Sequence, residues 1–518
     1  MPLCLQNSPS FELLRNYLQA AGFNEQSICS RLGITELCEL IINPRKYAIP
    51  PQESDALGLL TRLLLLGESF KKEELESVIS SRVVEALMNL GLASLDATDA
   101  SRLFCPFALY PVGSVLTVSD RWLTPDGKGF EPSADFVYPA ITPNTLGFLA
   151  TLPLTPCDHF LELCAGAAPV ALTAASRYAR HAWAVDITER STQAADFNRL
   201  LNGFDNVTAL QGDCYQGLEG LQFDRIVAHP PYMPVAQPAQ TFYDGGQDGE
   251  QVTRRIVEGL PRYLRPGGCF YCLALGSDRK SAPFEQRLRS WLGDNQADFD
   301  VAVIERRAQD PKDAAMVYAM KSKGGYEAFN LMRDNFSKLD IESLSYGWIM
   351  IQRKMERRKV FTVRRSAGPR LRRDEIAWLL KWETFAAGPS AFKDLLDMIP
   401  VARPSLELRA VHRMKEGELV LDQLELHAED PFAMNCRVDP WTASLLPLCN
   451  GQSTVRQVAE TCKANGLILP ETPPEEFARF IALLISGGYI EVAEFRPPIP
   501  PAKGEVPEIK AASKIPHL

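Results

Sequence analysis

Between residues 150 and 355, short apolar segments alternate with helical segments, and this alternation restricts the possible folds more than any other feature. The strand-like segments read HFLELCAG, HAWAVDIT, NVTALQGD, FDRIVAHP, GCFYCLAL and DVAVIERR. Segments such as APVALTAASRYA and ERSTQAADFNRLLNGF lie between them and have the spacing of helices. Strands that alternate with helices are typical of a parallel sheet. The sequence therefore predicts an α/β, doubly wound sheet with its ligand at the carboxyl ends of the strands.

The chain of 518 residues is too long for one ordinary core, so we expect several domains. Helices followed by paired strands near the start favour a winged-helix-like unit, and two helices followed by a strand near the end favour another. The expected divisions are a helical N-terminal domain over 1–100, a β-rich connection over 101–145, the α/β domain over 146–355, a basic linker over 356–374, a winged-helix-like domain over 375–494 and a disordered tail over 495–518.

Composition excludes several classes of protein. The formal net charge is -9, which argues against nucleic-acid binding through bulk charge. No apolar run reaches the roughly 18 residues of a membrane span, and the start MPLCLQNSPSFELLRNYL lacks the pattern of a signal peptide. The only CxxC pair, Cys269 and Cys272, falls in a strand-like segment, where positions three apart point to opposite faces. We therefore expect a cytoplasmic protein with reduced cysteines, no metal and no membrane partner.

Three strand-like segments end in residues suited to binding a nucleoside. Glu162 precedes a turn of small residues that includes Cys164 and Gly166, and such a turn lets a ligand approach the backbone. Asp186 ends the second segment, where a carboxylate can accept hydrogen bonds from both hydroxyls of a ribose. Asp213 follows the third segment and is placed to accept a hydrogen bond from an adenine amino group.

The fourth strand-like segment ends in RIVAHPPYMP. Pro230 and Pro231 have no backbone N–H and cannot continue a sheet ladder, so the strand must end abruptly. The two prolines form a rigid shelf that presents His229 and Tyr232. A neutral histidine offers one hydrogen-bond donor and one acceptor, and its ordinary pKa of about 6.5 also allows it to act as a base near pH 7.

Together these features resemble the class I S-adenosylmethionine-dependent methyltransferases. The likeness is to the branch with an Asn/Asp-Pro-Pro-aromatic motif and a "methyltransferase small" domain. That branch includes release-factor and ribosomal-protein glutamine methyltransferases, and N6-adenine and rRNA guanine methyltransferases. FNRLLNGFDNV and GGQDGEQVTRRIVEGLPRYLRPGG also resemble segments of that branch, and the resemblance covers roughly residues 140 to 355. LLLLGESF, PVGSVLTVSDRW, RRAQDPKDAAMVY and LSYGWIMIQRK resemble a bacterial group with a helical region before the catalytic domain.

The resemblance implies a Rossmann-like sheet of seven strands and S-adenosyl-L-methionine as the cofactor. The residues that it assigns to the cofactor are Glu162, Cys164, Gly166, Asp186, Ile187, Asp213 and Cys214. It assigns catalytic roles to His229, Pro230 and Tyr232. In the family, the side chain at the first motif position and the carbonyl of the following proline accept hydrogen bonds from the target NH2, while the aromatic ring packs over the planar amide or base.

The sequence departs from the family pattern at both places. The glycine-rich turn of the family reads D-x-G-x-G-x-G, whereas here Glu162 replaces the Asp, Cys164 the first Gly and Ala168 the last. His229 stands where the family has Asn or Asp. This weakens the case for glutamine or adenine as the acceptor, and it opens O-methylation or amine N-methylation.

Three functions stay open at this point. The first is methylation of a nitrogen, in an amide or amino group, of a protein or RNA. The second is O- or N-methylation of a small molecule or a peptide natural product, with His229 as general base. The third is a catalytically inactive scaffold that still binds the cofactor. The ten basic residues of 352–373 would bind RNA phosphates or form a solvated edge strand and linker. The oligomeric state is left open.

Overall fold

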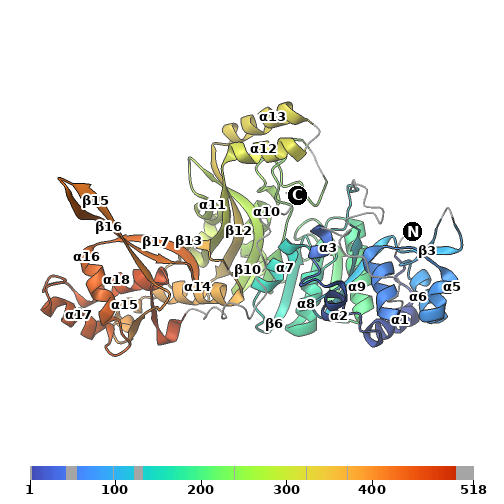
Figure 1. Ribbon diagram of the computed structural model, residues 1–518, viewed down its shortest axis with the longest axis horizontal. Helices are drawn as coiled ribbons and strands as arrows, with labels where there is room; N and C mark the ends of the chain where they lie inside the picture. Colours follow the sequence, from blue (N-terminus) through green and yellow to red (C-terminus); the bar gives the residue numbers. More distant parts are fainter. Residues whose placement is uncertain are drawn as a thin grey trace.

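The computed structural model describes residues 3–42, 55–96, 99–121, 132–237, 240–321, 324–369 and 371–496. The N-terminal helices, the central sheet and the C-terminal unit follow one another along the long axis of the molecule (Figure 1). The predicted disordered tail lies outside the described residues from position 497 onward. Within the described ranges, no helix has both the length and the apolar character needed to cross a membrane.

An 11-stranded sheet runs through the molecule in the order β15-β16-β17-β13-β11-β12-β10-β9-β6-β7-β8. Its α/β part comprises β6 (Cys157–Leu163), β7 (Ala179–Asp186), β8 (Val207–Gln211), β9 (Phe223–Ala228), β10 (Leu264–Arg279), β11 (Phe299–Gln309) and β12 (Ile341–Arg353). β6 to β10 are parallel to one another, and β12 is antiparallel to both β10 and β11. This arrangement confirms the predicted Rossmann-like sheet of seven strands within the larger one.

Both faces of this sheet are buried, which explains why its strands are almost continuously apolar. In β9, Ile226 and Ala228 point into one hydrophobic cluster, while Val227 points into another on the opposite face. The crossover helices are α8 (Pro169–Arg177), α9 (Glu189–Asn202), α10 (Gln251–Tyr263) and α11 (Phe284–Trp291). α9 shows why its sequence is helical: Thr188 caps its first turn through the N–H of Ser191, and Gly203 ends it in a left-handed conformation.

The N-terminal region packs against the α/β sheet through a hairpin. Its elements are α1 (Ser8–Ala20), α2 (Glu25–Leu32), α3 (Glu39–Ile42), α4 (Ala56–Leu60), the π-helical turn η2 (Thr61–Leu66), α5 (Lys72–Val78), α6 (Ser81–Asn89) and the short strands β1 (Phe70–Lys71), β2 (Ser94–Leu95) and β3 (Arg102–Phe104). The hairpin of β4 (Phe107–Val112) and β5 (Val115–Asp120) follows. The side chain of Asn198 in α9 accepts a hydrogen bond from the N–H of Val118 at 2.8 Å and donates one to its carbonyl at 3.1 Å.

The stretch expected to be a basic linker, 356–374, is instead part of the sheet. It contains β13 (Thr362–Ala367), which pairs in parallel with β11 and in antiparallel with β17. Its arginines form ion pairs: Arg358 with Asp300 at 2.9 Å, Arg364 with Asp278 at 2.6 Å and Arg365 with Glu383 at 2.6 Å. Asp300 is fully buried, and a buried carboxylate requires a paired cation. These three arginines therefore pair with carboxylates of this chain, as the edge-strand alternative expects, and RNA contact by the other basic residues of 352–373 stays a prediction.

The C-terminal unit extends the sheet, a feature that the sequence did not predict. Its helices are α14 (Arg373–Ala386), α15 (Ala391–Leu395), α16 (Pro440–Leu445), α17 (Val455–Ala464) and α18 (Pro474–Ser486); its strands are β14 (Pro400–Ala402), β15 (Glu407–Lys415), β16 (Glu418–Ala428), β17 (Phe432–Val438) and β18 (Ile490–Val492). β14 pairs with β18, while β15 and β16 form a hairpin that projects from the molecule (Figure 1). A helical hairpin, α12 (Pro311–Lys321) and α13 (Gly325–Lys338), stands above the sheet between β11 and β12 (Figure 1).

Candidate active site

The turn from β6 into α8 keeps the backbone of a glycine-rich turn, although only one glycine is left. Cys164 has φ 54°, Gly166 has φ 54° and Ala168 has φ 60°. The left-handed region costs a non-glycine residue on the order of 1–2 kcal/mol. A Cβ placed on Gly166 would meet no atom within 4 Å, so open space lies beside the middle of the turn. The turn therefore has the shape that its sequence pattern predicted, held at a cost in strain.

Glu162 ties this turn to the helix that follows it. The side chain is buried, and one carboxylate oxygen accepts a hydrogen bond from the N–H of Ala171 at 2.6 Å. Burial raises the pKa of Glu162 to about 8, although the N–H groups at the start of α8 oppose that rise. The structure thus gives Glu162 a partner in α8, and its predicted contact with a cofactor stays a prediction.

Asp186 lies at the carboxyl end of β7 and is bonded to the turn. Its Oδ2 accepts a hydrogen bond from the N–H of Gly166 at 2.8 Å, and its Oδ1 accepts two from Thr188, from the N–H at 3.0 Å and from the hydroxyl at 3.1 Å. Each carboxylate oxygen has two acceptor positions, so Oδ2 can still bind one further donor. The neighbouring Ile187 is 50% exposed. Two of the predicted residues, Gly166 and Asp186, are thus brought into direct contact.

Asp213 follows β8, and its carboxylate is engaged by a residue that the sequence did not reveal. Arg255 in α10 forms an ion pair with it at 2.7 Å, and this hydrogen bond lowers the pKa of Asp213. Both side chains are partly exposed, at 46% for Arg255 and 40% for Asp213. The adjacent Cys214 is buried and has φ 54°, so a third non-glycine residue near the strand tips is left-handed. Arg255 bonds only Oδ2, so acceptor positions on Oδ1 are left for a donor from a ligand.

His229 follows β9 and lies between two aromatic rings. Its ring centroid is 5.8 Å from that of Tyr232, with 17° between the planes, and 5.9 Å from that of Phe148. Its Nε2 atom is buried and has no hydrogen-bond partner among the residues that the structure describes. Burial lowers the pKa of His229 to about 4. The imidazole is therefore neutral at pH 7 and is a weak base.

Tyr232 is fixed by groups that lie far away in the sequence. Its hydroxyl accepts a hydrogen bond from the side chain of Asn144 in α7 (Pro143–Thr151) at 3.2 Å. Its ring centroid is 5.4 Å from that of Tyr346 in β12. Burial raises the pKa of Tyr232 well above its ordinary value, so the phenol stays protonated. Sequence reasoning missed Asn144 and Tyr346, because no local pattern connects them with the shelf.

The shelf residues 229–232 are clasped by the following loop. The N–H of Met233 donates to the carbonyl of Tyr243 at 3.2 Å, and the N–H of Gly245 donates to the carbonyl of Met233 at 3.0 Å. A Cβ on Gly249 would lie only 2.4 Å from the carbonyl oxygen of Tyr232. Glycine is therefore required at 249, and the close contact fixes the backbone of the shelf.

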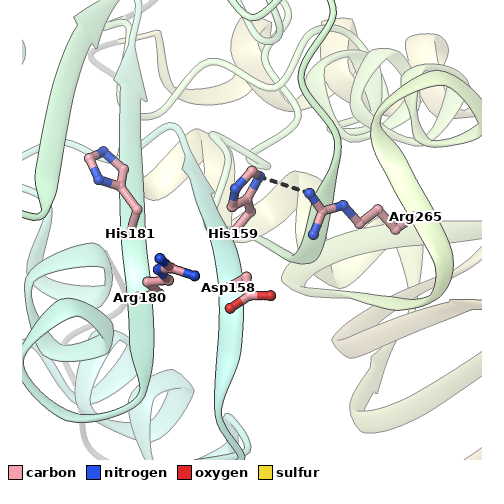
Figure 2. A pocket seen from close by; sticks show the side chains of 5 residues that line it. All are labelled: Asp158, His159, Arg180, His181 and Arg265. Carbon is pink, nitrogen blue, oxygen red and sulfur yellow. Dashed lines mark hydrogen bonds between the residues drawn. The ribbon is translucent and has the colours of Figure 1, made fainter.

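A cavity of about 260 Å³ lies at the other edge of the sheet, and Figure 2 shows its lining residues, Asp158, His159, Arg180, His181 and Arg265. Within it, Arg265 contacts Nδ1 of His159 at 3.1 Å (Figure 2). These residues belong to the first positions of β6, β7 and β10, which are the amino ends of parallel strands. Ligands of open α/β sheets bind at the carboxyl ends. The cavity is thus separate from the site formed by the turn and the shelf.

Cysteine and metal chemistry have little support at the site. Cys269 packs against one hydrophobic cluster and Cys272 lies in the other, so the two thiols of the CxxC pair face opposite sides of the sheet. In the part of the chain that the structure describes, no group of three or more His, Cys, Asp or Glu side chains has a metal-binding arrangement.

Comparison with known proteins bears on the same region. Residues 136–296 match the family described as "Methyltransferase small domain". The release factor glutamine methyltransferase of Moorella thermoacetica is 36% identical over 143 residues, which are 25% of this chain and 50% of that protein. The ribosomal protein uL3 glutamine methyltransferase of Bradyrhizobium diazoefficiens is 30% identical over 161 residues, which are 28% of this chain and 50% of that protein. The chain spans about half the length of these curated relatives.

Solved structures are similar at a lower level. The T. Thermophilus 16S rRNA N2 G1207 methyltransferase in complex with AdoMet and guanosine has 16% sequence identity and a TM-score of 0.27, over 55% of this chain and 63% of that one. The family match agrees with the predicted class, because residues 136–296 match a methyltransferase small domain. The turn and the shelf both lie within those residues.

Proposed function

We propose that this chain is an S-adenosylmethionine-dependent methyltransferase that modifies an amide or amino nitrogen of a protein. The observation that carries the proposal is the unpartnered, buried Nε2 of His229, held on the Pro230-Pro231 shelf. The shelf follows β9 at the same sheet edge as Gly166 and Asp186, which follow or end β6 and β7. A group that accepts a hydrogen bond and a site for a nucleoside are thus placed at one edge.

The residues at this edge fit the cofactor. The space beside Gly166 admits a ligand close to the backbone, and Oδ2 of Asp186 keeps one acceptor position for a ribose hydroxyl. The residues that would hold it are the predicted set, Glu162, Cys164, Gly166, Asp186, Ile187, Asp213 and Cys214. When bound, S-adenosylmethionine supplies an electrophilic methyl group on a sulfonium. Asp213 can accept a hydrogen bond from adenine while it stays paired with Arg255, because Arg255 bonds only Oδ2.

The residues of the shelf would orient the acceptor nitrogen. With its proton on Nδ1, His229 accepts one hydrogen bond from the NH2 through Nε2, and the carbonyl of Pro230 accepts the other. The nitrogen lone pair would then be turned toward the cofactor site, and the proton that the nitrogen loses would pass to water. Correct alignment supplies several of the roughly 7–11 kcal/mol available to well-oriented reactions. Tyr232, fixed by Asn144, would pack over the planar group.

Two observations favour protein over RNA as the substrate. The relatives reported above are named for a release factor and a ribosomal protein. Arg358, Arg364 and Arg365, which would bind phosphates, are engaged with carboxylates of this chain. A substrate that belongs to the translation apparatus would also place the reaction in the cytoplasm.

The pKa of His229 counts against its use as a general base. A base works best when its pKa lies near the working pH, whereas burial lowers the pKa of His229 to about 4. The second open function, O- or N-methylation of a small molecule with His229 as base, is therefore disfavoured. The strained turn supports cofactor binding, because Cys164 and Ala168 keep a costly conformation there, but it does not separate an enzyme from a scaffold that binds the cofactor.

Methyl transfer from labelled S-adenosylmethionine tests the proposal directly. The purified chain is incubated separately with a release factor, with ribosomal protein uL3 and with ribosomal RNA, and the same assays are run with His229→Leu. Label in a protein with the native chain, and none with the variant, is the expected result. Label in RNA alone would transfer the proposal to the other substrate class. Binding of S-adenosylmethionine by calorimetry without transfer to any of these substrates would favour the inactive scaffold, and no binding would refute both.

A further inference from the structure

The hairpin of β15 and β16 leaves an unusual amount of apolar surface in water. All nine residues of β15 are exposed. The exposed fraction is 44% for Leu408, 67% for Met414, 68% for Leu419 and 40% for Leu421. Exposed apolar residues gathered in one place mark an interaction surface, whereas scattered ones are ordinary.

These side chains form one stripe along the hairpin. The register pairs Leu408 with Leu426 and Met414 with Leu419. Leu426, near the base, is fully buried in the core of the C-terminal unit. The stripe therefore continues that core outward to the tip, where nothing in the described part of the chain covers it.

β15 is also an open sheet edge. It is the last strand of the 11-stranded sheet, and the register shift at Val411/His412 places the extra residue in β16, so β15 itself runs without a bulge. The strand contains no proline. Proteins usually protect an edge by shortening it, bulging it, or adding proline or charged side chains, and of these β15 has only the charges of Glu407, Arg409, Arg413 and Lys415.

We propose that two copies of this chain associate through antiparallel pairing of β15 with β15, with Val411 on the two-fold axis. In that register the residue at position i faces the residue at 822 − i, because 407 + 415 = 822. Glu407 then faces Lys415 of the second copy, so unlike charges meet. Leu408 faces Met414 of the second copy, so the apolar stripes meet as well.

The pairing also corrects the weakness of the hairpin. Pairing of β16 with β17 covers only Leu424 to Ala428, so the tip of the hairpin has two strands, an arrangement that is marginal alone, whereas three or more strands with an apolar face are stable. Joining the edges gives a sheet in the order β16-β15-β15-β16 and covers both open edges. A symmetric dimer needs such a self-complementary patch.

In this register Arg409 of one copy faces Arg413 of the other, and carboxylates of the same chain offset the repulsion between the two positive charges. Arg409 forms an ion pair with Glu407 at 2.7 Å, and Arg413 forms one with Asp422 at 2.8 Å. Each guanidinium thus has a carboxylate of its own chain beside it. An extended peptide of another protein would bind β15 equally well only if its charged and apolar residues occurred in the same order as those of β15.

Site-directed cysteines test both the association and its register. In a Cys436→Ser background, which removes an exposed thiol, Val411→Cys places two thiols opposite each other on the axis. We expect this variant to form a disulfide-linked dimer of twice the 57.6 kDa chain mass under mild oxidation. Arg409→Cys is the matched control, because it would face position 413 rather than itself. Arg409→Cys and Arg413→Cys should cross-link when mixed, and neither should cross-link alone.

Sedimentation of the native chain supplies the second measurement. A dimer that is lost in Val411→Asp and kept in Val411→Thr supports the pairing, since only the first change places two carboxylates together. A native chain that sediments as a monomer at every concentration overturns the proposal. Equal cross-linking of Arg409→Cys and Val411→Cys also overturns it, because that result indicates random collision.

Discussion

The cofactor turn, residues 162–168, and the shelf, residues 229–232, both depart from the family pattern, but in different ways. In the turn Cys164 and Ala168 stand where the family has glycine, and both are left-handed, a conformation that glycine adopts without strain. In the shelf the prolines are kept, and the changed residue, His229, is the one proposed to orient the acceptor nitrogen. The departure in the turn introduces backbone strain, and the departure in the shelf changes which hydrogen bonds the side chain can form. The comparison teaches that a glycine pattern reports backbone shape, which other residues can adopt at a cost.

The two regions also respond to pH in opposite directions. Burial raises the pKa of Glu162 from 4.5 to about 8 and lowers the pKa of His229 from 6.5 to about 4. Both groups are therefore neutral in the folded protein at pH 7. Because of Glu162, the folded protein becomes less stable as pH rises. Because of His229, the folded protein becomes less stable as pH falls.

The largest expected effect is on the turn. Asp186→Ala removes the acceptor for ribose hydroxyls and the hydrogen bond to the N–H of Gly166. Hydrogen bonds to a charged group contribute about 1.5–3 kcal/mol each, so the Kd for S-adenosylmethionine should rise about 100-fold. Titration calorimetry measures it. Asp205→Ala, which changes an exposed carboxylate, is the control and should leave the Kd unchanged. An unchanged Kd in Asp186→Ala would mean that the ribose is bound elsewhere.

The shelf should affect turnover instead of cofactor binding. His229→Leu removes the acceptor atom, and a misplaced acceptor costs about 100-fold in rate, whereas the Kd for S-adenosylmethionine should stay the same. His229→Asn restores an amide acceptor and should keep most of the activity. Initial rates with the substrate found above provide the measurement.

The pH profile separates the two roles of His229. Since its pKa is lowered to about 4, the imidazole keeps one protonation state above pH 6, and its contribution to the rate should be flat from pH 6 to 8. A rate that rises with a midpoint near 6.5 and becomes flat in His229→Asn would identify a general base and contradict the orienting role.

A smaller effect concerns stability. The folded protein keeps a proton on Glu162 between pH 4.5 and about 8, and the unfolded chain does not, so this group makes the native chain less stable as pH rises. Each pH unit within that window is worth at most about 1.4 kcal/mol, which gives on the order of 2 kcal/mol between pH 5 and 7. Glu162→Gln should remove this decline, as measured by urea unfolding at both pH values. Equal slopes in the variant and the native chain would show that Glu162 is ionised when folded.

The smallest effect tests the strain itself. Ala168 has φ 60°, so Ala168→Gly should raise the free energy of unfolding by up to about 1 kcal/mol, less the greater chain entropy of glycine in the unfolded state. Ala167 is the control, since it is buried beside Ala168 and is not left-handed, and Ala167→Gly should destabilise. Urea unfolding measures both. A loss of stability in both variants would indicate that position 168 carries no strain.

The sequence predicted the parts of the site that follow strand ends, and it missed those that only packing brings near. Gly166, Asp186 and His229 follow from local rules, because apolar strands end where polar or glycine residues begin. Asn144, which bonds Tyr232, and Arg255, which pairs with Asp213, lie 88 and 42 residues away from their partners. No periodicity or turn signal connects residues at those separations.

By itself, the sequence determined the order of strands and helices from 150 to 355, the break at the two prolines and the class of domain that they form. These are local properties, because burial on both faces requires continuous apolar strands and proline removes an N–H wherever it stands. Only the tertiary structure decided which charged side chains form pairs and which strand lies at the edge of the sheet. It showed that Arg358 neutralises the buried Asp300, so that a basic run became part of the sheet, and that β15 is left as an open edge. Pairing of charges and exposure of strands depend on which distant segments meet, and a linear pattern carries no record of that.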